Sequence, residues 1–195
     1  MPNWCTTDIT IKGSKKDIKW VYDLIQKHND RKEDSVGFFE SLIPSPNWDK
    51  TPNEDGELPV PDPARDADGN ITFMFSKFPS TGRNDDRWYD WNINNWGTKW
   101  EVSNIEVTDI SDDQLVCYWD TAWSPSIPIF NKLVERGLDV DAEFKDEGWM
   151  FAGRYVNGEV EDYKIEIIEA DENEEDDGWD RVIVYSKECP EGEHY

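Results

Sequence analysis

The alternation of apolar and polar residues predicts that the chain opens with a strand and continues into a helix. Residues 3–12 alternate with a period of two, which is typical of a half-buried strand. Gly13 ends this run, and Ser14 followed by Asp17 forms a capping-box-like start for a helix over 15–28. The apolar positions of the two patterns are Ile9, Ile11, Ile18, Val21, Tyr22 and Ile25, and the polar face of the strand carries Asp8, Thr10 and Lys12.

A second group of patterns begins near residue 86 and predicts a short helix followed by an antiparallel hairpin. Residues 86–96 repeat at helical spacing, and Gly97 stands where a C-terminal cap is expected. The stripe of this helix consists of Trp88, Trp91 and Asn95. Residues 100–108 and 114–121 then alternate on either side of a short polar turn, which indicates two paired strands.

The pattern from 124 to 145 predicts a second amphipathic helix and the most regular strand of the chain. Ser124 and Pro125 fit the capping residue and the first helical position, and Gly137 ends the helix. The buried stripe would be Ile127, Phe130 and Val134. Residues 138–145 alternate strictly, with Asp139, Asp141, Glu143 and Lys145 on the charged face.

The order of these elements is β-α-(insertion, helix)-β-β-α-β. This order predicts an α+β protein with a ferredoxin-like split β-α-β antiparallel sheet and helices on one face. The domain would span 1–158, with a long Pro-rich insertion at about 29–87 in which only 38–43 and 71–75 look ordered. The prolines of that region are Pro44, Pro46, Pro52, Pro59, Pro61, Pro63 and Pro79.

Alternation returns after the domain and predicts a C-terminal extension over 159–195. Residues 163–167 and 182–184 would pair as a hairpin, with an acidic loop at 169–178 between them. A further strand at 148–156 would lie at the edge of the main sheet. An exposed edge there could support association of copies, so the oligomeric state stays open.

Composition and charge indicate a folded protein that avoids nucleic acids. Apolar residues make up 36% of the chain, but 11 Trp, 8 Phe and 7 Tyr supply large units of buried area. The net charge of −24 is uneven: it is 0 over 1–50, −4 over 51–100, −9 over 101–150 and −11 over 151–195. Such a surface repels phosphates and attracts basic proteins, although acidic side chains also serve solubility alone.

Motifs for catalysis, metals and targeting are missing from the sequence. The two histidines, His28 and His194, adjoin no nucleophile motif, and Gly97-Thr98-Lys99 lacks the earlier glycine of a phosphate-binding loop. In the Asp- and Gly-rich stretches near 66 and 178, neither the first nor the twelfth position of a calcium-binding loop carries a carboxylate. Three distant cysteines and short apolar runs indicate neither a disulfide framework nor a membrane span. We expect a cytoplasmic protein that is not an enzyme, with no catalytic residue, cofactor or specific metal site.

Aromatic and small polar residues concentrate in the segments 95–100 and 119–125, which contain four of the tryptophans. Tryptophans at such spacing are mainly core residues, but the set could also line a pocket for a flat ligand. Asp120 would accept hydrogen bonds from its neighbours, and Lys99 is its plausible ion-pair partner. The possible pocket comprises Trp96, Thr98, Lys99, Trp100, Trp119, Asp120, Thr121 and Trp123.

Four short motifs resemble those of the YubB ferredoxin-like, or Api92-like, family. They are Pro-Asn-Trp-Cys at 2–5, Asn-Trp-Gly-Thr-Lys-Trp at 95–100, Asp-Thr-Ala-Trp-Ser-Pro at 120–125 and Phe-Ala-Gly at 151–153. The resemblance covers roughly 1–158, and it departs from the family at Ser126, where a second proline is usual. It implies a ferredoxin-like fold without an iron–sulfur cluster and an origin in bacteriophages, conjugative plasmids or bacterial genomes. It implies no catalytic residue.

Two hypotheses for function follow. In the first, the chain is an accessory protein of a phage or mobile element, and its acidic surface mimics DNA phosphates and inhibits a basic host defence protein. The residues of that surface would be Asp171, Glu172, Glu174, Glu175, Asp176 and Asp177. In the second, the Trp-rich pocket sequesters a nucleotide-like signal. An enzyme acting through clustered carboxylates ranks third.

Overall fold

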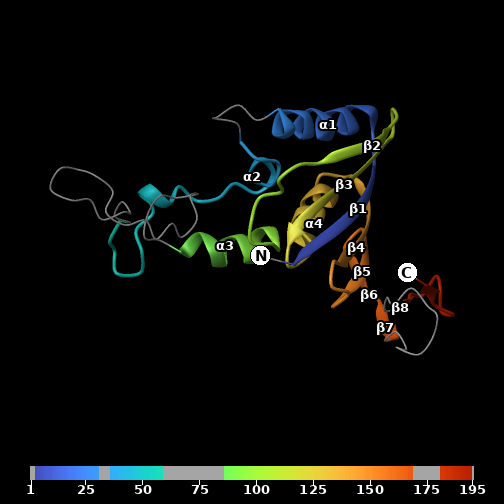
Figure 1. Ribbon diagram of the computed structural model, residues 1–195. Helices are drawn as coiled ribbons and strands as arrows, with labels where there is room; N and C mark the ends of the chain where they lie inside the picture. Colours follow the sequence, from blue (N-terminus) through green and yellow to red (C-terminus); the bar gives the residue numbers. More distant parts are fainter. Residues whose placement is uncertain (1–2, 31–35, 59–85, 169–180, 195) are drawn as a thin grey trace.

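The computed structural model describes residues 3–30, 36–58, 86–168 and 181–194, and the element order predicted from the sequence is present in it (Figure 1). The first elements are β1 (Trp4–Lys12), α1 (Lys15–Asn29), α2 (Phe38–Leu42), the 3-10 turn η1 (Trp48–Lys50) and α3 (Arg87–Trp96). The following elements are β2 (Glu106–Ile110), β3 (Gln114–Ala122), α4 (Ile127–Glu135), β4 (Asp139–Asp146), β5 (Ala152–Val156) and β6 (Glu159–Asp162). The last are β7 (Lys164–Ile168), β8 (Arg181–Tyr185) and β9 (Glu193–His194).

The main sheet is antiparallel and has the strand order β2-β3-β1-β4-β5-β6. Its first four strands with α1 and α4 form the split β-α-β arrangement of ferredoxin-like proteins, so the predicted fold class is confirmed. Helices α1 and α4 lie on the same side of the sheet (Figure 1). We call this side the covered face and the opposite side the open face.

The core lies between the covered face and the helices. Along β1 the side chains alternate, and Cys5, Thr7, Ile9 and Ile11 are buried while their neighbours are partly or fully exposed. The largest buried side chain is Trp119 of β3. Its ring centroid lies 5.9–6.2 Å from those of Phe38, Phe39 and Phe130. Because a large aromatic ring buries on the order of 150–250 Å², this cluster supplies a large part of the stabilising apolar area.

Helix α2 comes from the predicted insertion but belongs to the core. Phe38 and Phe39 are buried, and the carboxylate of Glu101 accepts hydrogen bonds from the backbone N–H groups of Phe39 and Glu40 at 2.9 Å. His28, at the end of α1, accepts the N–H of Phe38 through Nδ1. The expectation of an ordered stretch at 38–43 is therefore confirmed, whereas 71–75 lies outside the described residues.

Glu101 also explains why the first hairpin strand starts later than predicted. The sequence predicted a strand over 100–108, but β2 begins at Glu106. The segment before it follows the core, since Val102 and Ile105 are buried and the side chain of Asn29 bonds both backbone groups of Ile105. The alternation over 100–105 therefore comes from an irregular segment that packs against α1 and α2 and pairs with no described strand.

Helix α4 likewise starts later than predicted. Its first residue is Ile127, the N-cap is Ser126, and Pro128 stands in the first turn. The predicted cap, Ser124, instead donates its hydroxyl to the carbonyl of Gly97. The buried residues of the helix are Ile129, Phe130 and Leu133, so the stripe is rotated from the predicted one.

The C-terminal part differs from the prediction in two respects. The strand predicted at the edge, now β5, is covered by β6, so the main sheet continues to Asp162, beyond the predicted domain end at 158. Strands β7 and β8 pair as predicted, but β9 joins them to make a three-stranded sheet. The acidic loop at 169–178 lies outside the described residues.

Candidate functional site

The two Trp-rich segments lie together at one end of the main sheet, as predicted. Thr98 donates its hydroxyl to the carbonyl of Ala122 at 2.9 Å, and Ser124 bonds the carbonyl of Gly97. Gly97 ends α3 with φ 79°, and a Cβ there would lie 2.7 Å from Pro128 and 3.0 Å from a backbone oxygen. Only glycine fits this left-handed, crowded position, which is the physical reason for the motif.

The predicted pocket does not form as one site, because half of its residues belong to the core. Trp96, Thr98, Trp119 and Thr121 are at most 6% exposed. The indole N–H of Trp96 donates to the carbonyl of Ile43, and the hydroxyl of Thr121 donates to the carbonyl of Ser124. These four residues are structural.

Three of the other four, Lys99, Trp100 and Trp123, form an aromatic cluster together with Tyr89. The lysine ammonium lies 4.5 Å from the ring centroid of Trp123, 4.7 Å from that of Trp100 and 5.5 Å from that of Tyr89. Such cation–π contacts contribute roughly 0.5–2 kcal/mol each, depending on exposure. The lysine therefore occupies the space between the indoles of Trp100 and Trp123, whose centroids are 6.5 Å apart.

Asp120 does not pair with Lys99, and this expectation was wrong. Its carboxylate accepts the hydroxyl of Thr6 at 2.8 Å, from the neighbouring strand β1. The reason is the direction of the side chain, since residue 120 points to the open face while Trp119 and Thr121 point into the core. The predicted acidic surface, Asp171, Glu172, Glu174, Glu175, Asp176 and Asp177, lies outside the described residues.

The open face of the sheet carries a line of mainly acidic residues that crosses all six strands. Following the register from β2 to β6, directly opposed residues form one row: Glu106, Tyr118, Asp8, Glu143, Arg154 and Glu161. We call this set the acidic row. Four of its six members are carboxylates, and it lies on the side of the sheet that α1 and α4 leave uncovered.

Most members of the acidic row have partners nearby. Tyr118 donates its hydroxyl to Glu106, and Tyr163 donates its hydroxyl to Glu143 at 2.8 Å. Arg154 makes two bonds of 2.8 Å to Asp141 and an ion pair to Glu188, and Glu161 accepts the backbone N–H of Lys187. Burial and the bond to Glu143 raise the pKa of Tyr163, so it stays a donor. These contacts tie the residues before β7 and after β8 to the main sheet.

Asp8 is the exception in the row. Within the described part of the chain its carboxylate makes neither a hydrogen bond nor an ion pair. The residue stands directly opposite Glu143 on β4. Like charges directly opposite each other on neighbouring strands destabilise a sheet, by up to about 1 kcal/mol. The open face thus holds a pair of carboxylates whose repulsion a cation would relieve.

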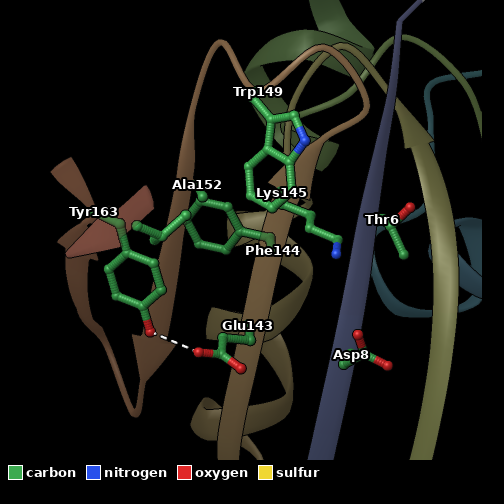
Figure 2. Close-up of a pocket in the computed structure, with 9 residues that line it drawn as sticks. Thr6, Asp8, Glu143, Phe144, Lys145, Trp149, Ala152 and Tyr163 are labelled. Carbon is green, nitrogen blue, oxygen red and sulfur yellow. Dashed lines mark hydrogen bonds between the residues drawn. The ribbon is translucent and has the colours of Figure 1, made fainter. Parts of the chain in front are cut away.

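A cavity of about 240 Å³ opens beside this pair (Figure 2). It is lined by Thr6, Asp8, Glu143, Phe144, Lys145, Trp149, Ala152, Tyr163 and Val184. Trp149 stands above Lys145, whose ammonium lies 5.1 Å from the ring centroid, and the hydroxyl of Tyr163 points at Glu143. We call this space the open-face cavity. It combines aromatic walls with two carboxylates and one internal cation.

The tight turn after β4 positions Trp149 over the cavity. Asp146, 2% exposed, accepts the N–H groups of Gly148 and Met150 on one carboxylate oxygen, and its backbone carbonyl accepts the N–H of Trp149. Trp149 adopts φ 55°, a left-handed conformation that is rare for a bulky residue. The buried carboxylate stabilises a turn that the residue at 149 would otherwise avoid.

Other features of the described residues give no comparable site. A wider hollow of about 560 Å³ lies between α1 and β2, and half of its lining residues belong to the edge strand itself. In 3–30, 36–58, 86–168 and 181–194, no three His, Cys, Asp or Glu side chains are placed to hold a metal ion. No helix in these ranges is long and apolar enough to span a membrane. Burial raises the pKa of the Cys5 and Cys117 thiols to about 12, so neither is a nucleophile in the folded protein.

The geometry defines a ferredoxin-like α+β protein whose sheet has one core face and one acidic, uncovered face. Residues 95–183 match the family model described as the ferredoxin-like domain in Api92-like protein. This part of the chain is therefore similar to the ferredoxin-like domain of the Api92-like family, in agreement with the resemblance seen in the motifs. The match includes the motifs at 95–100, 120–125 and 151–153 and begins after the one at 2–5.

One solved structure that resembles this chain is the crystal structure of a protein api92 from Yersinia pseudotuberculosis. It is 11% identical in sequence and superimposes with a TM-score of 0.48, covering 84% of this chain and 99% of that chain. No curated protein matches this chain.

The sequence singled out none of the residues that line the cavity. A signal was present, because the alternation over 138–145 placed Glu143 and Lys145 on a charged face and that over 3–12 placed Asp8 on a polar one. The missing information was the register between β1 and β4, which alone brings Asp8 opposite Glu143.

Proposed function

We propose that this chain is a non-enzymatic interaction protein that binds a basic protein through the open face of its sheet. The observation that supports the proposal best is the acidic row, four carboxylates in one line across six strands on the uncovered side. A line of four carboxylates, interrupted by Tyr118 and Arg154, is complementary to a surface that normally contacts nucleic-acid phosphates. The partner is therefore a nucleic-acid-binding protein, and the open face occupies its phosphate-binding surface.

The biological setting belongs to the same proposal. The motifs of the family suggest a phage or other mobile element as the source, and a host defence protein that acts on DNA as the partner. The acidic segment 171–177 adds negative charge within the same C-terminal quarter, which has a net charge of −11. In this scheme the chain mimics DNA and inhibits by occupying a binding surface, so no catalytic residue is needed.

The alternative, a module for a nucleotide-like ligand, has less support. The predicted pocket divides into core residues and a partly exposed cluster, and Lys99 lies between the half-buried indole of Trp100 and the exposed indole of Trp123. The open-face cavity of about 240 Å³ is also smaller than the roughly 300–1,000 Å³ of typical small-molecule sites. Both observations favour a surface that binds protein.

Affinity capture from bacterial extracts with three forms of the protein tests the proposal. The forms are the wild type, the double variant Asp8→Asn/Glu143→Gln, and the control Asp23→Asn/Glu135→Gln. The control removes the same two charges, but from α1 and α4. We expect wild type and control to retain the same basic proteins at low salt, and the open-face variant to lose them. Equal capture by all three forms, or no basic protein retained by any, would contradict the proposal.

A fourth form of the protein tests whether the acidic segment 171–177 contributes to the capture of basic proteins. Replacing Asp171, Glu172, Glu174, Glu175, Asp176 and Asp177 by their amides removes six charges outside the main sheet. If these residues extend the binding surface, capture weakens, and raising the ionic strength has less effect on what remains. Unchanged capture would restrict the proposal to the open face.

A further inference from the structure

We propose that the open-face cavity binds the guanidinium group of an arginine side chain from the partner protein. This inference rests on the proposed function, because it names the group by which a basic partner is recognised. It is a separate claim, since a basic protein could contact the acidic row without filling the cavity.

The charges of the cavity favour a cation. Asp8 and Glu143 stand directly opposite each other, and a group with positive charge between them replaces repulsion by two attractions. Tyr163 fixes one of these carboxylates from the side, at 2.8 Å, and leaves the other oxygen of Glu143 available to a ligand. Asp8 keeps both carboxylate oxygens available, because its side chain makes no hydrogen bond or ion pair with another described residue.

The walls of the cavity show which kind of cation it accepts. Trp149 and Tyr163 line the same space as the two carboxylates, and in Figure 2 Trp149 lies at the top and Tyr163 at the left, next to Glu143. Lys145 places its ammonium 5.1 Å from the ring centroid of Trp149, so the indole already interacts with one positive group, and an incoming guanidinium would share the ring with Lys145 or displace it. A flat guanidinium stacks on aromatic faces and carries five N–H donors in a fork, whereas an ammonium is a strongly hydrated point charge. Two separate carboxylates beside an indole fit arginine better than lysine.

The size of the cavity limits the ligand to one side chain. A volume of about 240 Å³ lies below the roughly 300–1,000 Å³ typical of sites for whole small molecules. The position fits the same conclusion, since the cavity opens on the uncovered side of the sheet, beside the middle of the acidic row (Figure 2). A protein lying along that row would bring its side chains directly over the opening.

Titration with small model compounds tests the cavity without any partner protein. The probe is N-acetyl-arginine methylamide at millimolar concentration, compared with the lysine and norleucine analogues. The readout is the indole N–H resonance of Trp149, assigned by its loss in Trp149→Phe. We expect a saturable shift with the arginine probe, a weaker one with lysine and none with norleucine. Equal shifts with all three probes, or none with arginine, would overturn the inference.

Two matched variants separate a built site from general attraction to an acidic protein. Asp8→Asn and Asp120→Asn each remove one charge from the open face, but Asp120 bonds to Thr6 and does not line the cavity. We expect Asp8→Asn to weaken binding of the arginine probe about tenfold, as loss of a charge-assisted bond does, and Asp120→Asn to change it less than twofold. Equal effects of the two variants would show that net charge alone attracts the probe, which contradicts a specific site.

A variant at Lys145 is expected to change the affinity for the arginine probe in the opposite direction. Lys145→Gln removes the positive charge that lies over Trp149, so we expect the arginine probe to bind more tightly, by about threefold or more. Lys132→Gln, on α4, is the control and should leave binding unchanged. Weaker binding of the arginine probe by the Lys145 variant would contradict the inference, because removal of a neighbouring positive charge must favour a cation at this site.

The two claims can fail independently. If Asp8→Asn abolishes binding of the arginine probe but the protein still captures the same basic partners, the cavity binds arginine and is not the site that recognises them. If no basic partner is captured while the probe still saturates, the proposed function fails and the cavity site stands.

Discussion

The two faces of the main sheet differ in what their side chains do. On the covered face, residues such as Trp119, Ile9 and Ala142 are at most 1% exposed and pack against helices. On the open face, the same strands carry Tyr118, Asp8 and Glu143, which contact solvent, one another or the C-terminal residues. Because side chains along a strand alternate between two faces, the residues that stabilise the fold and those available for recognition lie on opposite sides of the sheet. Single substitutions can therefore change stability or recognition with little effect on the other.

The largest difference between the faces is expected at two adjacent residues of β3. Trp119→Ala removes the ring that contacts Phe38, Phe39 and Phe130, and it should lower the free energy of unfolding by about 3–5 kcal/mol. Tyr118→Ala, on the open face, loses a bond to Glu106 at the surface and should cost about 1 kcal/mol. Urea denaturation followed by circular dichroism measures both. Equal losses would contradict the assignment of one face to the core.

A second prediction tests how closely the covered face is packed. A Cβ added at Gly153 would lie 2.4 Å from the carbonyl oxygen of Glu161 and 2.8 Å from the ring of Phe144. Gly153→Ala should therefore destabilise the protein by about 1–3 kcal/mol, because backbone and ring must both move. Val156→Ala on the same strand is the control, since Val156 is 40% exposed, and it should change stability by about 0.5 kcal/mol. Thermal unfolding that ranks the two variants in the reverse order would refute this close contact.

A third prediction concerns pH and the carboxylate that caps α2. Burial raises the pKa of Glu101 to about 7, against the opposing effect of three backbone N–H donors. Because the folded-state pKa exceeds the unfolded value, the folded protein binds this proton more tightly, and stability falls as pH rises from about 4.5 to about 7. We expect Glu101→Gln to remove about 1–3 kcal/mol of this pH dependence, as measured by urea denaturation at several pH values. A wild-type profile that keeps its slope in the variant would assign the slope to other groups.

The smallest predicted effect is a gain in stability on the open face. Asp8→Asn relieves the repulsion with Glu143 and should stabilise the protein by about 0.2–1 kcal/mol at low salt. The gain should shrink at high ionic strength, because the pair is exposed. Asp120→Asn is the matched control, since its amide oxygen can still accept the hydroxyl of Thr6. If Asp8→Asn destabilises the protein, this carboxylate has a structural partner and the comparison of faces needs revision.

Sequence patterns predicted the strands and helices that have regular partners. Residues 3–12, 15–28, 114–121 and 138–145 are close to β1, α1, β3 and β4, because their alternation arises from one buried face. The predicted element boundaries are wrong where contacts with residues distant in the sequence determine the local structure. Glu101 caps α2 and Asn29 bonds Ile105, so the chain before β2 is not a strand, and Ser124 bonds Gly97, so α4 starts two residues later.

The site was less predictable than the fold for the same reason. Composition showed that the surface is acidic, and the alternation placed Asp8 and Glu143 on polar faces. The sequence favoured the tryptophans as core residues and left a pocket as the alternative; Trp96 and Trp119 are indeed buried in the core, and Lys99 lies between Trp100 and Trp123. No sequence pattern indicated a role for Trp149, because its position over the cavity depends on a turn that the buried carboxylate of Asp146 stabilises.

The sequence by itself determined which residues share a face of β1, α1, β3 and β4, the order of the elements and the resemblance to a family. These properties are local or additive, since they depend on spacing along the chain, on the sum of charges and on short motifs. Only the tertiary structure decided which faces meet. The register of β1 against β4 brings two carboxylates together, and the turn at 146–150 places an indole above them. Contacts between residues more than a hundred positions apart are set by packing and hydrogen bonds across the sheet, and local spacing contains no record of them.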